Sequence, residues 1–147
     1  MVSPRKTGFF VLEGMNSFAV AFYFNHLLFR FRDDHGFNQL QSLWLLAAFG
    51  AIYASFSALA GWFSQRHGYF TSLRIGLGGM MVALLIGAQW PSLTGQLTGL
   101  GIWTATVCFT WPVLEALCSE LEPPDRLPDR VGFYNVVWAL LDRKSVV

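Results

Sequence analysis

The sequence predicts an all-α membrane protein, a polytopic bundle of transmembrane helices, and two observations carry that prediction. Hydrophobic residues make up 54% of the 147 residues and charged residues only 13%, and the mean hydropathy is +0.44. Roughly a quarter of the residues in a soluble domain are charged, so this chain lacks the residues for a water-facing shell. The second observation is a series of apolar stretches near the length of about 20 residues that crosses the hydrocarbon core of a bilayer.

Four stretches are long and apolar enough to be predicted as spans. They cover about residues 8–30, 43–63, 72–90 and 93–117. Glu13 is the one formal charge of the first span before Arg30 at its end, whereas the second span contains none. Pro112 interrupts the fourth span and predicts a kink there, because membrane helices tolerate proline. Glu115 lies near the exit of the same span.

A fifth apolar stretch, residues 131–141, is too short to cross. Eleven residues rise about 16 Å as a helix, roughly half the hydrocarbon thickness. The sequence therefore predicts a single, incomplete membrane domain over residues 1–147. Two explanations stay open: a truncated or frameshifted end at Leu141–Val147, or a short protein whose fifth segment lies in the interface or is completed by a partner chain.

Basic residues in the short loops predict the orientation, because Lys and Arg favour the cytoplasmic side. With the N-terminus inside, six basic residues fall on the cytoplasmic side and two on the opposite side. The six are Arg5, Lys6, Arg66, Arg74, Arg126 and Arg130, and the two are Arg30 and Arg32. The expected location is the cell membrane, with a cytoplasmic N-terminus.

Small residues recur four positions apart in three of the predicted spans. They are Gly50, Ala54 and Ala58 in the second span, Gly79, Ala83 and Gly87 in the third, and Gly95 with Gly99 and Gly101 with Ala105 in the fourth. Such spacing lets helix backbones approach closely within a membrane. The alternative is the ordinary abundance of Gly and Ala in membrane helices, but the repetition in three segments favours a packed bundle.

A short polar segment separates the second and third spans: Gly61-Trp62-Phe63-Ser64-Gln65-Arg66-His67-Gly68. It resembles the signature loop of the major facilitator superfamily, Gly-x-x-x-Asp-Arg/Lys-x-Gly-Arg/Lys-Arg/Lys. Gly61, Arg66 and Gly68 match, whereas Gln65 stands in place of the Asp, and Tyr69 and Phe70 replace the final basic pair. We expect Gly61 to permit close helix approach, Gly68 to form a turn with positive φ, and Arg66 to bond helix-end carbonyls.

The fourth span offers weaker support for the same resemblance. Its Gly99-Leu100-Gly101 matches a Gly-x-Gly element of the family, but Gly95 stands where members often carry an Arg. The resemblance covers about residues 8–141 and accounts for the first four to five helices of an N-terminal half, in a family of about twelve helices.

This resemblance implies secondary active transport of a small solute by alternating access. The segment with Gly61, Gln65, Arg66 and Gly68 would act as a cytoplasmic gating loop. The implied partners are the lipid bilayer, a small-molecule solute, optionally a coupling proton or cation, and the missing C-terminal helices or a partner chain. The alternative function is a small, non-transporting membrane subunit or anchor that packs with another chain.

The first span carries candidate residues for the substrate path. At 100° per residue, Glu13, Ser17, Val20 and Phe24 share a face, which Asn16 and Tyr23 flank. Ionisable groups inside spans are costly and usually face a cavity or a partner. The alternative is that Glu13, about 8 Å from the start of the span, reaches the interface or pairs with Arg5 or Lys6.

Other functional classes lack support in the sequence. The net charge of +1 and the absence of a basic cluster argue against nucleic-acid binding. Cys108 and Cys118 have no disulfide or metal spacing, and the three histidines are dispersed. Without a nucleophile-base pair, metal set or phosphate loop, we expect neither enzymatic activity nor a cofactor or metal.

Overall fold

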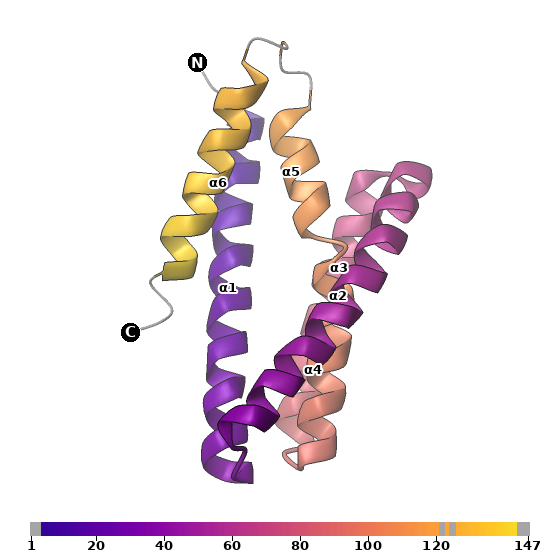
Figure 1. Cartoon of the computed structure of the whole chain (residues 1–147). Coiled ribbons are helices and arrows are strands. Elements are labelled where there is room, and N and C mark those ends of the chain that lie inside the picture. The colour runs from indigo at the N-terminus through magenta and orange to yellow at the C-terminus, as the bar shows by residue number, and fades with distance from the viewer. Residues whose placement is uncertain (1–3, 121–122, 124–125, 144–147) are drawn as a thin grey trace.

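The computed structural model describes residues 4–120, 123 and 126–143, and within them the chain forms six helices and no strand. The helices are α1 (Pro4–His35), α2 (Gln39–His67), α3 (Tyr69–Gln89), α4 (Leu93–Val107), α5 (Trp111–Ser119) and α6 (Leu127–Arg143) (Figure 1). The prediction of an all-α bundle is confirmed.

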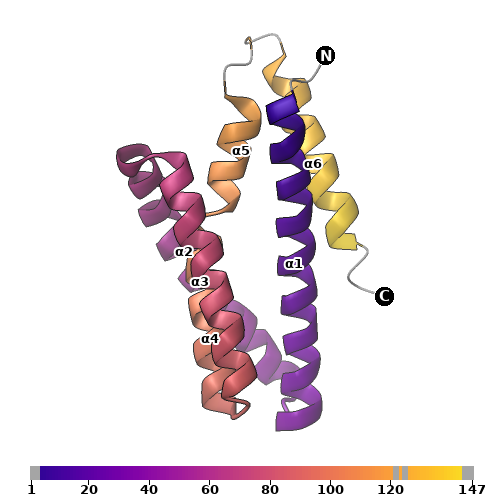
Figure 2. The same ribbon diagram turned by 180° about the vertical axis from the view of Figure 1, so that it is seen from behind.

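Successive helices alternate in direction along the bundle, and α2 is inclined to α1 (Figure 1). In Figures 1 and 2, α1 descends, α2 rises, α3 descends, α4 and α5 rise together, and α6 descends beside α1. The start of α1, the α2–α3 connection, the end of α5 and the start of α6 therefore lie at one end of the bundle. The α1–α2 and α3–α4 connections lie at the other end, which is the alternation that repeated membrane crossing requires.

The first helices extend beyond their predicted bounds, so the connections are short. α1 continues past residue 30 to His35, where Arg30 and Asp34 form an (i, i+4) ion pair at 3.0 Å. α2 begins at Gln39 with a capping box: the Asn38 side chain accepts from the Gln41 backbone N–H, and the Gln41 side chain accepts from the Asn38 N–H, both at 2.9 Å. Charged and polar residues thus complete helix ends here and do not form long loops.

The fourth predicted span is two helices, α4 and α5, separated by a three-residue turn at 108–110. Pro112 lies in the first turn of α5, where its missing N–H costs least, and it cannot continue the ladder of α4. The Ser72 hydroxyl of α3 donates to the Phe109 carbonyl at 3.2 Å. A side chain of a neighbouring helix therefore satisfies a carbonyl at the break, as membrane proteins require.

Among the described residues, three segments are long and apolar enough to cross a membrane by length and composition: α2, α3, and α4 with α5 as Leu93–Ser119. α1 is outside this set although it has 32 residues, because Glu13 and several uncharged polar residues lower its hydropathy. α6 begins at Leu127, four residues before the predicted fifth segment, and its 17 residues rise about 25 Å. The last four residues of the predicted break at Leu141–Val147 lie outside the described part.

The helix pair with the most extensive contact is α3 with α4, and small residues make this packing possible. A Cβ on Gly79 would overlap the Thr106 side chain, and one on Gly99 would lie 3.0 Å from the Ala83 carbonyl oxygen. The predicted role of the small-residue spacing is confirmed for these positions. It is wrong for Gly50 and Gly101, where an added Cβ meets nothing within 4 Å.

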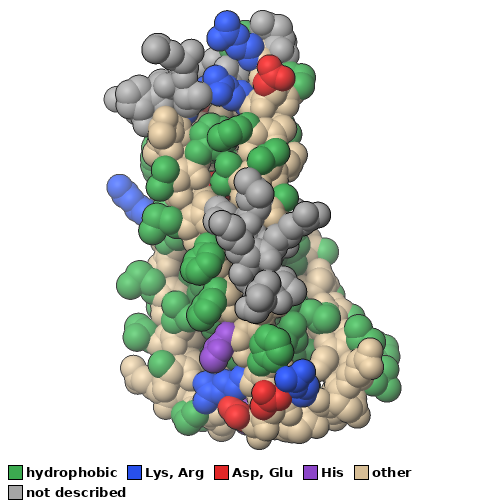
Figure 3. Space-filling view, turned by 90° about the vertical axis from the view of Figure 1, so that its left-hand side faces the viewer, with side chains coloured by type: hydrophobic (Ala, Val, Ile, Leu, Met, Phe, Trp, Pro, Cys, Tyr) green, Lys and Arg blue, Asp and Glu red, His purple; other side chains and the backbone are tan. Residues whose placement is uncertain are grey.

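Buried apolar residues form several separate clusters along the bundle. One joins α1, α2 and α4 through Leu27, Phe31, Phe49 and Leu100, and another joins α3 and α5 through Leu73, Val113, Leu114 and Leu117. Many other large hydrophobic side chains are exposed, including Phe22, Trp44 and Met81. Figure 3 shows one face on which charged side chains gather mostly toward the two ends and hydrophobic ones cover the length between them, which suits a bundle surrounded by lipid.

Candidate functional site

The segment predicted as a gating loop is almost entirely helical, so the prediction of a loop is wrong for residues 61–67, whereas its gating role stays a prediction. α2 continues to His67 and α3 starts at Tyr69, and Gly68 alone connects them. Gly68 has φ 88° and ψ 149°, which confirms the expected turn with positive φ. Its N–H donates to the Ser64 carbonyl at 2.9 Å, and its carbonyl accepts from the Ser72 N–H at 3.2 Å. The connection is therefore a single residue that completes both helix ends.

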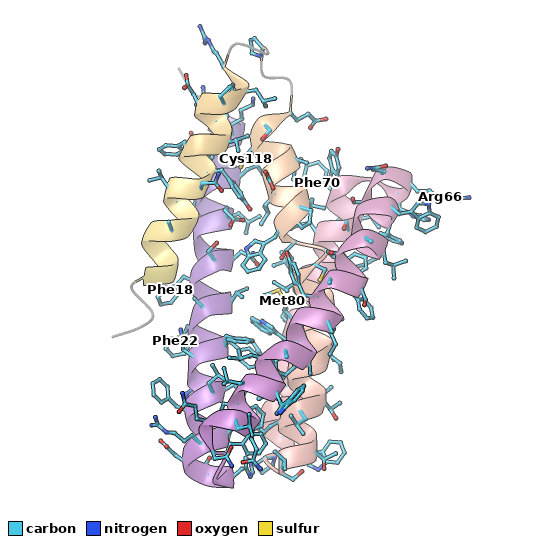
Figure 4. The ribbon with its side chains drawn as sticks, viewed as in Figure 1. Phe18, Phe22, Arg66, Phe70, Met80 and Cys118 are labelled. Carbon is cyan, nitrogen blue, oxygen red and sulfur yellow. The ribbon has the colours of Figure 1, made fainter. Side chains whose placement is uncertain are left out.

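The other residues of this segment differ from expectation as well. Gly61 faces open space, since an added Cβ would meet nothing within 4 Å, so it does not mediate close helix approach. Arg66 lies over the Trp62 ring, 5.5 Å from its centroid, and points away from the bundle (Figure 4). Within the described part of the chain, Arg66 makes no hydrogen bond to a helix-end carbonyl. Gln65 is exposed beside it.

Glu13 is the most deeply buried ionisable residue of α1, with an exposed fraction of 0%. The Ser17 hydroxyl donates to its Oε1 at 2.7 Å, while its Oε2 has no hydrogen-bond partner. α5 and α6 cover this part of α1, and Tyr134 of α6 and Glu115 of α5 both interact electrostatically with the carboxyl group. The side chain thus turns into the bundle and does not reach the interface; the Arg5 side chain lies outside the described part.

Two further candidates on α1 also bury polar atoms without partners. Both polar side-chain atoms of Asn16 lack a hydrogen bond, and so does the Tyr23 hydroxyl. Tyr23 packs against Trp103 of α4, with ring centroids 4.2 Å apart. A buried polar group without a partner costs about 1–3 kcal/mol, so these atoms are candidates for contact with a bound water, ion or solute.

A cavity of about 450 Å³ lies between α1, α2, α4 and α5. Ser17, Val20 and Phe24 line it along α1, so part of the predicted polar face does border a cavity. The remaining wall consists of Ala21, Asn25, Leu46, Phe49, Gly50, Tyr53, Trp103, Thr104, Val107 and Trp111. Glu13 does not line this cavity directly, but its hydrogen bond to Ser17 places it immediately behind the wall.

A second cavity, of about 460 Å³, lies on another side of α1, against α3 and α4. Tyr23 lines this second cavity together with Phe22, His26 and Leu84. The four predicted path residues are therefore divided: Ser17 borders the first cavity, Tyr23 borders the second, and Glu13 and Asn16 are buried and line neither.

Sequence reasoning missed the aromatic residues that dominate the first cavity. Trp103 and Trp111 flank the α4–α5 break, and each buries an indole N–H without a partner. Tyr53 of α2 packs edge-on against Trp111 at 6.0 Å between ring centroids. A usable signal was present in the sequence, because both tryptophans fall well inside the fourth span, away from the span ends where indole rings favour the interface.

The structure also explains one departure from the resemblance. A side chain at Gly95, where an Arg was expected for the family, would overlap the carbonyl oxygen and the side chain of Trp90. Gln96, the next residue, instead donates from Nε2 to the Gly87 carbonyl at 2.7 Å. The entry of α4 is thereby fixed by packing against α3, with no room for a long cation at position 95.

Among the residues that the structure describes, no group of three or more His, Cys, Asp or Glu side chains could hold a metal ion. The described site thus consists of apolar and aromatic walls, a few uncharged polar groups and one buried carboxyl group. This composition suits binding of a small molecule.

Comparison with known proteins agrees with this architecture. Residues 6–141 match the family model described as Major Facilitator Superfamily. Among curated proteins and among solved structures, nothing matches the chain. With nearly its whole length covered by the family model, and with an all-helical bundle holding three segments able to span a bilayer, this integral membrane protein belongs to the Major Facilitator Superfamily, a family of transporters.

Proposed function

We propose that this chain forms part of the solute path of a secondary active transporter that moves a small solute by alternating access. The observation that supports this most directly is the cavity between α1, α2, α4 and α5. Ligand sites in proteins are typically concave and mostly apolar, with volumes of roughly 300–1,000 Å³ and a few placed polar groups. The cavity, at about 450 Å³, is of that kind.

The positions of Ser17 and Glu13 support a path along α1. Ser17 lines the cavity, and its hydroxyl donates to the buried Glu13. A change in the charge or hydrogen bonding of Glu13 would alter the side chain that a solute meets. Glu13 is therefore proposed as a residue that links solute binding to a coupling proton or cation.

Further helices complete the path in this proposal, because transporters of this kind bind solute at the interface between structural repeats. They would belong to the same polypeptide or to a partner chain. We further propose that the N-terminus is cytoplasmic, as the distribution of basic residues favours, and that the α2–α3 junction with Gln65, Arg66 and Gly68 contributes to gating on that side.

The test is uptake into cells that express the complete reading frame, measured with a panel of radiolabelled sugars, amino acids, organic acids and organic cations. We expect saturable uptake of at least one solute class. Glu13→Gln should abolish that uptake without lowering the amount of protein in the membrane, because the variant keeps the shape of the side chain and removes its charge.

Glu120→Gln is the matched control, since Glu120 is exposed at the end of α5, and its uptake should equal that of the wild type. Unchanged uptake in Glu13→Gln would contradict the role of Glu13. Absence of saturable uptake for every solute, at normal membrane abundance, would contradict the transport function and favour the non-transporting subunit.

A further inference from the structure

The first cavity is walled by aromatic rings that come from four different helices. They are Phe24, Phe49, Tyr53, Trp103 and Trp111. Phe24 and Phe49 pack edge-on with centroids 6.0 Å apart, and Tyr53 and Trp111 do the same at 6.0 Å. Because each of these four rings is held by another, the wall is organised before any ligand arrives.

An acidic side chain lies behind the described wall of this cavity, and the wall itself carries no basic side chain. None of its lining residues, all within the described part of the chain, is a Lys, Arg or His. Immediately behind Ser17 lies Glu13, whose Oε2 has no hydrogen-bond partner, and no ion pair joins Glu13 to a cation of the described residues. Burial disfavours the ionised form of a carboxyl group that has no counter-charge, so a positive charge in the adjacent space would stabilise Glu13 as a carboxylate.

From these two features we infer the class of solute: a monovalent organic cation that carries aromatic or other apolar groups. This inference rests on the proposed transport function and narrows it. Aromatic ring faces attract organic cations, and the attraction grows when the site is desolvated. A neutral molecule of the same shape would gain no such attraction, an anion would be repelled, and a bare metal ion would lack the oxygen ligands it needs.

The Tyr53 hydroxyl adds a polar group suited to such a ligand. It forms no hydrogen bond to any described residue, and Tyr53 lies in the cavity wall. The Thr104 hydroxyl, by contrast, already donates to the Leu100 carbonyl at 2.9 Å. Tyr53 is therefore available to accept from, or donate to, a polar substituent on the cation.

Tetraphenylphosphonium and tetraphenylborate test the inference, because they have nearly the same shape and opposite charge. Binding of each ion to the purified 147-residue protein in lipid nanodiscs is measured by equilibrium dialysis, with empty nanodiscs subtracted. We expect saturable binding of tetraphenylphosphonium that is at least about ten-fold tighter than any binding of tetraphenylborate, which corresponds to the factor of ten per 1.4 kcal/mol in affinity.

Substitutions distinguish the contribution of the Glu13 carboxyl group to binding from that of the aromatic rings. Glu13→Gln should weaken tetraphenylphosphonium binding about ten-fold, and Trp111→Leu should weaken it about three- to ten-fold. Glu120→Gln and Trp62→Leu are matched controls at exposed positions and should leave it unchanged. Circular dichroism and gel filtration verify that each variant folds. If Glu13→Gln does not fold, the inference is tested by Trp111→Leu and by the comparison of the two ions on the wild-type protein.

Equal binding of the two ions, or tetraphenylphosphonium binding that none of the folded cavity variants weakens, would overturn the inference. Its failure is distinguishable from failure of the transport function. Saturable uptake of an uncharged solute, unaffected by tetraphenylphosphonium, removes the cation inference and leaves transport intact. Binding of tetraphenylphosphonium without uptake of any solute by the complete reading frame contradicts transport alone.

Discussion

The helices on the two sides of Gly68 carry the same spacing of small residues but use it differently. On α3, Ala83 and Gly87 are buried and Gly79 is half-buried against α4, whereas Gly50, Ala54 and Ala58 of α2 are exposed. The difference lies in the partner helix: Thr106 fills the space above Gly79, and no helix occupies the space beside Gly50. Spacing of small residues thus allows a close approach, but a partner with complementary shape is needed before the approach occurs.

Gly79→Leu is the substitution with the largest expected effect, and it tests whether small residues matter for packing on α3 but not on α2. The new side chain would overlap Thr106 between the two helices with the most extensive contact, so we expect the free energy of unfolding to fall by about 3 kcal/mol, the upper range for overpacked sites. The measurement is reversible unfolding in detergent micelles. Gly50→Leu is the control on α2 and should change the free energy little; an equal loss in both variants would contradict the comparison.

Gly68→Ala tests the connection between the two helices. Because φ is 88° and ψ is 149° at this residue, a Cβ is strained there whatever the space, and we expect a loss of about 2 kcal/mol. Gly61→Ala, in the helical part of the same motif and facing open space, should be neutral or slightly stabilising. Unfolding measured for the pair separates backbone strain from packing, and a neutral Gly68→Ala would show that the turn takes another conformation.

Ser72→Ala is expected to change the free energy of unfolding least, and it tests how α3 contacts the break between α4 and α5. The substitution removes the donor to the Phe109 carbonyl, and hydrogen bonds between membrane helices are worth about 0.6 kcal/mol on average. Thr71→Ala, exposed on the neighbouring face of α3, serves as its control. If Ser72→Ala costs nothing while hydrogen exchange around residues 108–110 also stays unchanged, α3 does not support the break.

The membrane bundle itself was predictable from the sequence, because the length of each apolar stretch can be counted in the sequence and compared with the thickness of a bilayer. The second and third spans were placed within four residues of the observed helices. α2 extends further at both ends and α3 at its start, where Asn38 and Gly68 are the cap residues. The loop prediction failed at Gly61 and Gln65 because a helix end in a membrane protein accommodates glycine and exposed polar side chains without breaking. Pro112 correctly indicated a disruption of the fourth span. It did not indicate that residues 108–110 would form a turn that divides the span into two helices.

The candidate site was predictable only where it depends on local spacing. The hydrogen bond from Ser17 to Glu13 joins residues four apart on one helix, which helical periodicity provides. The cavity walls from Tyr53, Trp103 and Trp111 depend on how three helices cross, and a single sequence carries no direct information on that crossing. Tyr23 lies toward a different cavity for the same reason, since the rotation of α1 against α4 is set by packing with Trp103.

The one-residue connection at Gly68 has a mechanical consequence. A single residue supplies two backbone torsions, and both are constrained here because its N–H and its carbonyl are each engaged by a flanking helix. α2 and α3 therefore lack the slack to tilt independently at this end. A displacement of the α2 end that carries the exposed Arg66 would therefore also displace α3. Because α3 packs against α4 through Met80, Ala83 and Trp103, the displacement would reach the ring of Trp103.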